Sequence, residues 1–339
     1  MPTIKEIAQA TGVSPTTVSN VIHGRISKVS PKTLEKVQRA LKEGNYVSNM
    51  GGRLLANHGS RIIGVIMQNA RARELHKIQD PWFSEIIGAL EQKIREAGYF
   101  MLLYTSENYE ESLRLASMWR VEGIIAIGNH PDEVALFQAG TAVPIVFIDS
   151  YADKTVDVLN VGLQDFQGAY DMTSYLIQLG HRDMLFLGAN SQWVGVDKER
   201  SEGFRAARTD AGLETTEKNF LHVSDKTEIR HDRLRKFVET SKKLPTALVC
   251  SSDYYAVDTM NLFFELGFSV PQDISITGFD NNILSAQSRP KLTTVNQEVA
   301  EKAHRSVQLL MSTIQGEEIS EKRVVLPTQL IFRESVQKV

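Results

Sequence analysis

Cysteine is nearly absent from this chain, which has one in 339 residues. A single cysteine excludes an internal disulfide framework and is typical of proteins in a reducing compartment. It lies in the apolar run Ala247–Cys250, where we expect a buried strand residue rather than a nucleophile. No apolar run approaches the roughly 20 residues that a membrane-spanning helix needs. The N-terminus carries Lys5 and Glu6 with no apolar segment after them, so we expect no secretion signal and a cytoplasmic protein.

The sequence also lacks the common catalytic motifs. No G-x-G-x-x-G follows an expected strand, and there is neither a phosphate-binding G-x-x-x-x-G-K-[ST] loop nor a G-x-S-x-G elbow. The eight histidines form neither an H-E-x-x-H motif nor a cluster with cysteine. The triplet His181-Arg-Asp resembles part of a kinase catalytic loop, but Gly188 stands where that loop needs asparagine. We therefore expect no catalytic residues, no metal and no cofactor.

Charge is unevenly distributed along the chain, although the formal net charge is only −3. Residues 1–60 hold eight Lys and Arg against three Asp and Glu, whereas the remaining 279 hold 30 against 38. A basic N-terminal part on a mildly acidic remainder indicates that only the N-terminal part contacts a polyanion such as DNA.

Three helix starts are present in the first fifty residues. Thr3 and Glu6 form a capping box, and Ser14-Pro15 and Ser30-Pro31 each place a capping hydroxyl before a proline at the first helical position. The apolar positions at helical spacing are Ile4, Ile7 and Ala8, then Val18, Val21 and Ile22, and then Leu34, Val37 and Leu41. Two short helices joined by a tight turn at Gly12-Val13, with a third helix after them, predict a helix-turn-helix domain over residues 1–48.

In such a domain the second helix enters the major groove with its N-terminal side chains. The exposed residues there are Pro15, Thr16, Ser19 and Asn20, of which asparagine can hold adenine through two hydrogen bonds. Thr3, Ser14 and Thr17 are better suited to phosphates, and we add His23 to the expected DNA contacts. The alternative is an ordinary three-helix bundle without a DNA role, which the basic excess and the polar exposed face disfavour.

From Arg61 onward, apolar strand-like runs alternate with amphipathic helices. The expected strands are Ile62–Met67, Tyr99–Tyr104, Gly123–Gly128, Pro144–Ile148, Met184–Gly188, Ala247–Ser251 and Ile274–Gly278. The expected helices are Phe83–Ala97, one from about Tyr109, Asp165–Leu179 and Asp197–Ala211. This alternation predicts an α/β fold of parallel sheets with right-handed crossovers, in two similar subdomains. Ligands of such folds bind at the carboxyl ends of the strands, in the crevice between subdomains.

The N-terminal motifs resemble the lactose-repressor family of bacterial transcription regulators. The residues that carry the resemblance are Thr3–Ala8, Gly12–Ser14 and Thr17–Ser19, followed by a hinge-like segment Tyr46–Ala56. The resemblance implies a hinge at 49–60 that becomes helical on operator DNA, contacts DNA through Asn49 and Arg53, and wedges Leu55 into the minor groove. Ser48 stands where the family usually has proline, and the two glycines at 51–52 disfavour a helix by about 1 kcal/mol each. Asn20 stands where many relatives have arginine, which leaves the operator sequence open.

The resemblance continues through residues 61–339, most specifically at Glu199–Phe204, Asp273–Asp280 and Arg289–Val295. It implies a periplasmic-binding-protein-like body that binds an effector and forms the dimer. It also implies an N-subdomain of about 61–161 and 294–325, and a C-subdomain of about 162–293 and 326–339. The family's effector-facing arginine and aspartate correspond to Arg200 and Asp280. A guanidinium and a carboxylate can each bind vicinal hydroxyl groups, although the two could instead form an interdomain ion pair.

Further effector-site candidates lie near the expected strand ends. Trp82, Phe83 and Trp193 could each stack on a sugar, but the first two could equally be core residues at helical spacing. Asp149 ends an expected strand, and Ser252 and Asp253 follow another, where relatives often have Asn-Asp.

The expected partners are pseudo-palindromic operator DNA, a small effector, for which we favour a sugar, and a second copy of the chain. The second copy is expected because a two-fold symmetric operator needs a two-fold symmetric protein. An enzyme of this fold and a secreted solute-binding protein are the rival interpretations. The missing motifs oppose the first, and the missing signal and the basic N-terminal part oppose the second. Whether the effector induces or co-represses stays open.

Overall fold

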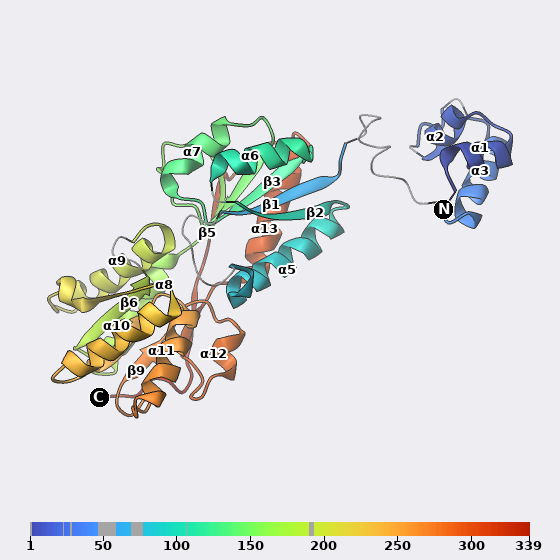
Figure 1. Cartoon of the computed structure of the whole chain (residues 1–339). Coiled ribbons are helices and arrows are strands. Elements are labelled where there is room, and N and C mark those ends of the chain that lie inside the picture. Colours follow the sequence, from blue (N-terminus) through green and yellow to red (C-terminus); the bar gives the residue numbers. More distant parts are fainter. Residues whose placement is uncertain are drawn as a thin grey trace. The chain divides into compact units, whose positions relative to one another are not determined.

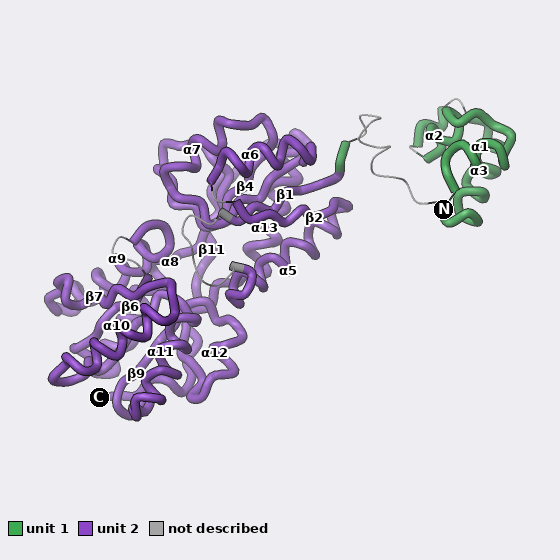
Figure 2. The backbone as a smooth tube through the Cα atoms, viewed as in Figure 1, with its two compact units in different colours: residues 1–60 green, residues 61–339 purple. Residues whose placement is uncertain are grey.

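The computed structural model describes residues 2–22, 24–27, 29–46, 59–68, 77–106, 108–189 and 193–339. The chain divides into two compact units, residues 1–60 and 61–339, which we call the head and the body (Figure 2). His23 and the hinge residues Asn49, Arg53 and Leu55 lie outside the described residues. Among the described helices, none combines the length and the apolar character that crossing a membrane requires.

The head is a bundle of three helices, α1 (Ile4–Thr11), α2 (Pro15–Ile22) and α3 (Pro31–Glu43). Its small core contains Ile7, Ala8, Val18, Val21 and Val37, with the other expected apolar positions packed against them. Gly12 ends α1 in the left-handed region, at φ +62°, which lets the chain turn directly into α2. The three predicted helices and the tight turn between the first two are therefore confirmed.

The body contains two parallel sheets with helices on both faces (Figure 1). The N-lobe sheet has the order β11-β5-β4-β3-β1-β2, and the C-lobe sheet has the order β7-β6-β8-β9. The N-lobe strands are β1 (Ile62–Gln68), β2 (Phe100–Ser106), β3 (Gly123–Ile127), β4 (Ile145–Ile148), β5 (Leu159–Leu163) and β11 (Arg323–Leu326). The C-lobe strands are β6 (Met184–Ala189), β7 (Phe220–Val223), β8 (Ala247–Cys250) and β9 (Ser275–Thr277), with an antiparallel pair β10 (Thr294–Asn296) and β12 (Gln329–Ile331). The predicted α/β class with parallel sheets is confirmed.

Helices cover both faces of each sheet (Figure 1). The N-lobe helices are α5 (Pro81–Glu96) and α13 (Val299–Ile314), which pack together on one face, and α6 (Tyr109–Met118) and α7 (Pro131–Ala139) on the other. The C-lobe helices are α8 (Asp165–Gln178) and α9 (Gly195–Asp210), which pack closely together, then α10 (Thr227–Thr240), α11 (Asp253–Glu265) and the short α12 (Ile283–Gln287). Two short 3₁₀ turns, η1 (Lys77–Gln79) and η2 (Glu217–Asn219), complete the described elements.

The chain passes between the lobes three times. It leaves the N-lobe after β5, returns between β10 and α13, and enters the C-lobe again between β11 and β12. The second passage contains Gln297, which is 2% exposed, and Glu298, whose φ is +49°. Side chains near these passages therefore reach both lobes.

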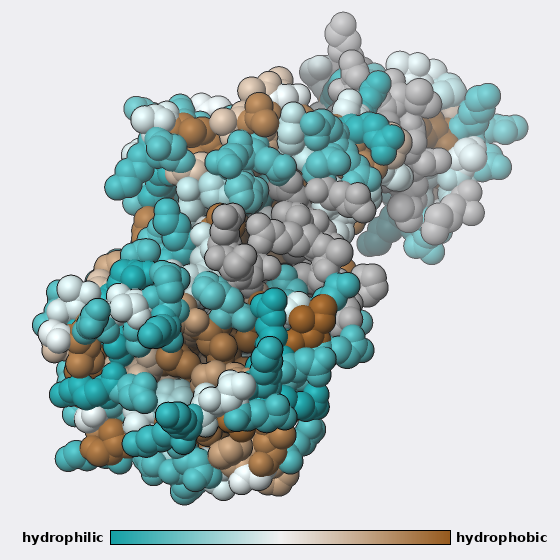
Figure 3. Space-filling view, turned by 60° about the vertical axis from the view of Figure 1, so that its left-hand side comes forward, coloured by the Kyte–Doolittle hydropathy of each residue, from teal (hydrophilic) through white to brown (hydrophobic). Residues whose placement is uncertain are grey.

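The apolar cores of the body are built from the strands and from the inward faces of the helices, and one of them continues from the N-lobe to Met172, Phe279 and Val295. On the face of the body drawn in Figure 3, the hydrophobic residues lie in small groups among hydrophilic ones. Several polar residues are instead buried where the two lobes meet, among them Arg200, Asp280, Gln297 and Lys302.

Candidate functional site

The second helix of the head presents a small polar surface at its N-terminal end. Pro15 and Thr16 are exposed, and Thr17, Ser19 and Asn20 are half-buried. Val18 and Val21 of the same helix point into the core, and Thr16, Ser19 and Asn20 lie on the side of the helix that faces away from it. The residues predicted to meet base edges are thus together on one exposed surface.

The hydroxyl groups predicted to bind phosphates already cap helices. Thr3 Oγ1 accepts a hydrogen bond from the Glu6 backbone N–H at 3.3 Å. Ser14 Oγ lies 2.9 Å from Thr17 Oγ1 and accepts from the Thr17 N–H at 3.1 Å. These groups remain at the surface, and the partial positive charge of each helix N-terminus lies beside them. They can therefore contact a phosphate while they cap their helices.

Arg200 is at the centre of the polar cluster in the body. It projects from α9, is 4% exposed, and donates from Nε to Asp165 Oδ1 at 2.7 Å. Its Nη1 donates to the Ser251 carbonyl at 2.6 Å and lies 3.8 Å from Asp280 Oδ1. The guanidinium also lies 3.7 Å from the centre of the Phe279 ring. Nη2 makes no hydrogen bond to any described residue. The guanidinium group, whose position the other contacts fix, therefore keeps unused N–H donors.

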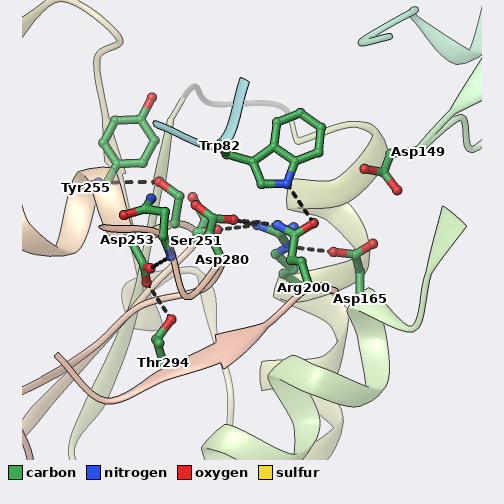
Figure 4. Close-up of polar contacts among 12 residues, drawn as sticks. Trp82, Asp149, Asp165, Arg200, Ser251, Asp253, Tyr255, Asp280 and Thr294 are labelled. Carbon is green, nitrogen blue, oxygen red and sulfur yellow. Dashed lines mark hydrogen bonds and ion pairs between the residues drawn. The ribbon is translucent and has the colours of Figure 1, made fainter. Parts of the chain in front are cut away.

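Figure 4 shows Arg200 between Asp165 and Asp280, with Trp82 above them. Asp280 follows strand β9, is 7% exposed, and accepts from Gln297 Nε2 at 2.5 Å. Burial raises the pKa of Asp280 well above its usual value, and the neighbouring Asp253 raises it further against the effect of Arg200. A carboxyl group with a raised pKa can donate as well as accept a hydrogen bond.

Gln297 connects this cluster to the N-lobe. Its Oε1 accepts from Trp82 Nε1 on α5 and from Lys302 Nζ on α13, both at 3.1 Å. The fully buried Lys302 also donates to both oxygens of Asp149, at 2.8 and 2.7 Å. Burial raises the pKa of Asp149 although Lys302 opposes this effect. A continuous set of polar contacts therefore runs from Asp149 in the N-lobe to Asp280 in the C-lobe.

The three aromatic candidates lie in different surroundings. Phe83 is 9% exposed and packs into the N-lobe core. Trp82 is only partly buried, and its indole N–H faces Gln297. Trp193 packs edge-on against Phe186 and lies 4.4 Å, centre to centre, from the His222 ring.

Two buried polar atoms lie close together near the ends of β6 and β8. Among the described residues, Trp193 Nε1 and Ser251 Oγ have no hydrogen-bond partner. A Cβ atom on Gly188 would lie 3.2 Å from the first and 3.4 Å from the second, so both lie against this glycine. An unpaired buried polar group costs about 1–3 kcal/mol, and such groups at strand ends suit a polar ligand.

Ser252 and Asp253 begin helix α11, which follows strand β8. Ser252 Oγ accepts from the Tyr255 backbone N–H at 3.3 Å and so caps the helix. Asp253 is fully buried; Thr294 Oγ1 donates to its Oδ1 at 2.5 Å and the Asn282 N–H donates to its Oδ2 at 2.9 Å. Burial raises the pKa of Asp253 to about 6, although these hydrogen bonds and Arg333 oppose it.

Several residues of the cluster were not predicted. Asp165 binds Arg200, the Tyr151 hydroxyl donates to Asp165, and Gln297 and Lys302 join the lobes. Their sequence surroundings carry no catalytic or binding motif. The available signal was position: Asp165 is the first residue of an expected helix, and Lys302 interrupts the apolar stripe of an amphipathic helix.

The chain is similar to known proteins over its whole length. Residues 3–49 match the family described as bacterial regulatory proteins, lacI family, and residues 173–336 match the periplasmic binding protein-like domain. The chain is 32% identical, over 346 aligned residues, to the HTH-type transcriptional repressor PurR of Pasteurella multocida (strain Pm70), with 99% of each chain covered. The solved structure of the Lac repressor bound to ONPG in the repressed state has a TM-score of 0.82 at 25% identity, covering 98% of this chain and 99% of that one. The complex of the transcriptional regulator CelR with cellobiose has a TM-score of 0.73, also at 25% identity, covering 99% and 100%.

Proposed function

The chain belongs to the lacI family of bacterial regulatory proteins, and from this membership we propose that it represses carbohydrate-utilisation genes under the control of a sugar. The family consists of DNA-binding transcription regulators with a ligand-binding body, not of enzymes. We propose that it acts in the cytoplasm, because a bacterial operator is found there.

On the DNA side, the outward face of α2 supports a role in base recognition. Pro15, Thr16, Ser19 and Asn20 reach base edges in the proposed complex, and the capped N-termini at Thr3, Ser14 and Thr17 contact phosphates. His23, Asn49, Arg53 and Leu55 stay predicted DNA contacts. Two heads on a pseudo-palindromic operator require a homodimer, which completes the proposal.

On the ligand side, the observation that carries the proposal is the partly unused fork of Arg200. The protein holds Nε and one Nη1 hydrogen, which fixes the guanidinium plane beside the Asp280 carboxyl group. A fixed guanidinium and a carboxyl group side by side suit adjacent hydroxyl groups of a sugar. The proposed ligand contacts are Trp82, Asp149, Trp193, Arg200, Ser252 and Asp280. The similarity to the CelR–cellobiose complex supports a sugar as the ligand.

A thermal-shift screen of the full-length protein tests this proposal. The panel contains monosaccharides, disaccharides, sugar phosphates and nucleobases, each added to wild type, Asp280→Ala and Asp183→Ala. A ligand at 100 times its dissociation constant adds about 2.7 kcal/mol of stability, which a melting curve resolves. We expect a sugar to stabilise the wild type and the exposed-site control Asp183→Ala, but not Asp280→Ala.

Other outcomes of the screen contradict parts of the proposal. If nucleobases alone stabilise the wild type, the ligand is a heteroaromatic compound and not a sugar. If a compound stabilises the wild type and Asp280→Ala equally, its binding site does not include this cluster. If no compound shifts the wild type, the ligand half of the proposal fails and the DNA half stands.

The proposed mechanism couples the two sites. Ligand bound where the lobes meet changes their mutual angle, and the dimer passes this change to the hinges and so to operator affinity. Coupling is reciprocal, so operator DNA must change ligand affinity by the same factor, typically 5- to 150-fold. We expect calorimetric titrations with and without operator duplex to differ by such a factor, and the sign of the difference distinguishes an inducer from a corepressor. Equal ligand affinity in both titrations would exclude the mechanism.

A further inference from the structure

The segment Asp280–Asn282 makes an unusual turn. Asp280 has φ +137° and Asn281 has φ +58°, so two consecutive residues other than glycine occupy the left-handed side of backbone space. Such positions cost about 1–3 kcal/mol each and persist only where the surroundings hold them. The contacts that hold this turn therefore decide where the Asp280 carboxyl group lies.

Asp253 provides the first tether. Its Oδ2 accepts a hydrogen bond from the Asn282 N–H at 2.9 Å, and its backbone N–H donates to the Phe279 carbonyl at 2.7 Å. Asp253 is therefore hydrogen-bonded to the residues on both sides of the turn. A Cβ atom on Gly278 would lie 2.3 Å from Asp253 Oδ1, which shows how closely this side chain packs against the end of β9. Both carboxylate oxygens are already bonded within the protein and the residue is fully buried.

Arg333, in the segment after β12, provides the second tether. Its Nη2 donates to Asn281 Oδ1 at 2.6 Å, and its Nη1 donates to the Leu292 carbonyl at 2.8 Å and to Ser285 Oγ at 3.1 Å. The planar fork thus ties the middle of the turn to the segments on either side of it. Nothing in the sequence motifs singled out this arginine.

We propose that Asp253 and Arg333 are positioning residues for effector binding: they hold the strained turn that presents Asp280 to the ligand, and neither touches the ligand itself. This inference rests on the proposed ligand site at Asp280. It replaces the predicted ligand contact of Asp253 with an indirect role and adds Arg333, which was not predicted. Loss of either tether lets the turn relax toward ordinary backbone angles and moves the Asp280 carboxyl group away from Gln297 and Arg200.

The position of Asp280 can be measured without a ligand. Asp280 binds Gln297 Nε2, and Gln297 Oε1 binds the indole N–H of Trp82, so displacement of Asp280 changes the surroundings of that N–H. The chain has three tryptophans, at 82, 119 and 193, and hence three indole signals in a ¹H–¹⁵N NMR spectrum. Trp82→Phe assigns the relevant signal, and Asp280→Asn shows where it moves when the contact is altered.

The decisive variants are Asn281→Gly and Arg333→Met in the full-length protein. Asn281→Gly removes the acceptor of the second tether, together with the hydrogen bond from Asn281 Nδ2 to Asn296 Oδ1 at 3.1 Å. It relieves rather than adds strain, because glycine accepts φ +58° freely. We expect the Trp82 signal to move toward its Asp280→Asn position in both variants, while the Trp119 signal stays. Arg289→Met is the matched control, since among the described residues that guanidinium donates to the carbonyls of Gln287 and Ser288 in its own loop and to no others. Asn281→Asp retains an acceptor for Arg333 but loses the hydrogen bond from Asn281 Nδ2 to Asn296 Oδ1, so a Trp82 shift that it shares with Asn281→Gly reports the Asn296 contact rather than the Arg333 tether.

A purely structural role for the tethers gives a different result. It lowers the melting temperature and leaves the Trp82 signal at its wild-type position, and that outcome in Asn281→Gly would overturn the proposal even if Arg333→Met fails to fold. Any compound that stabilises the wild type in the thermal-shift screen should bind Asn281→Gly at least tenfold more weakly. If Asn281→Gly binds that compound with wild-type affinity although its Trp82 signal has shifted, the proposed ligand site at Asp280 is overturned but the tethering of the turn is not.

Discussion

Arg200→Met is expected to lower the free energy of unfolding of the body by about 3–5 kcal/mol, the range for removing one partner of a buried ion pair. The side chain of Asp165 is fully buried and would lose its cation, and the Ser251 carbonyl would lose its donor. The stacking of the guanidinium on Phe279 would be lost as well. Methionine fills part of the volume but supplies no donor, so the destabilisation comes mainly from the carboxylate left behind.

Urea titration followed by tryptophan fluorescence measures this effect in the full-length protein, because all three tryptophans belong to the body. Arg205→Met on the same helix is the matched control. The Arg205 side chain is 36% exposed and lies 3.7 Å from Glu202 and 3.6 Å from Glu217. Its loss should cost less than about 1 kcal/mol, as for other surface ion pairs. Equal effects of the two variants would mean that the Arg200–Asp165 pair does not hold the site together.

The fold could be predicted from the sequence wherever the pattern is local. Helix α1 has its capping box and its glycine stop within ten residues, and strands β1, β3, β4 and β8 are continuous apolar runs. Strand β5 was not predicted, because Asn160 and Gly162 interrupt its apolar run. Asn160 is there for a tertiary reason: its Oδ1 accepts the backbone N–H of Ser150 across the strand ends. Such a contact leaves no periodic signal.

The candidate site could be predicted only in part, for the same physical reason. Arg200 and Asp280 stand in motifs that resemble a known family, and the structure brings them to 3.8 Å from each other. Gln297 is buried in a passage between the lobes, and Lys302 is a buried lysine within the apolar stripe of α13. Their importance arises from pairing with Asp149 and Asp280, which are far away along the chain. The two positive φ angles of the Asp280–Asn281 turn likewise follow from tertiary tethers.

Lys302→Met is the second replacement with a large expected effect. Lys302 is fully buried on α13, and the side chain of its partner Asp149 is 10% exposed. Removing the ammonium group leaves Asp149 without its cation and Gln297 Oε1 with one donor instead of two. We expect a loss of about 3–5 kcal/mol in the same urea titration, as for Arg200.

The double variant Lys302→Met/Asp149→Asn separates pairing from packing. Because desolvation opposes both charges, removing the two together costs much less than removing one, and we expect the double variant to regain at least half of the stability lost in Lys302→Met. Burial already raises the pKa of Asp149 in the wild type although Lys302 opposes this effect, so the double variant removes a charge that the surroundings disfavour. A double variant no more stable than Lys302→Met would mean that Lys302 acts mainly through Gln297. The passage between the lobes, rather than the Asp149 pair, would then be the contact that fixes their arrangement.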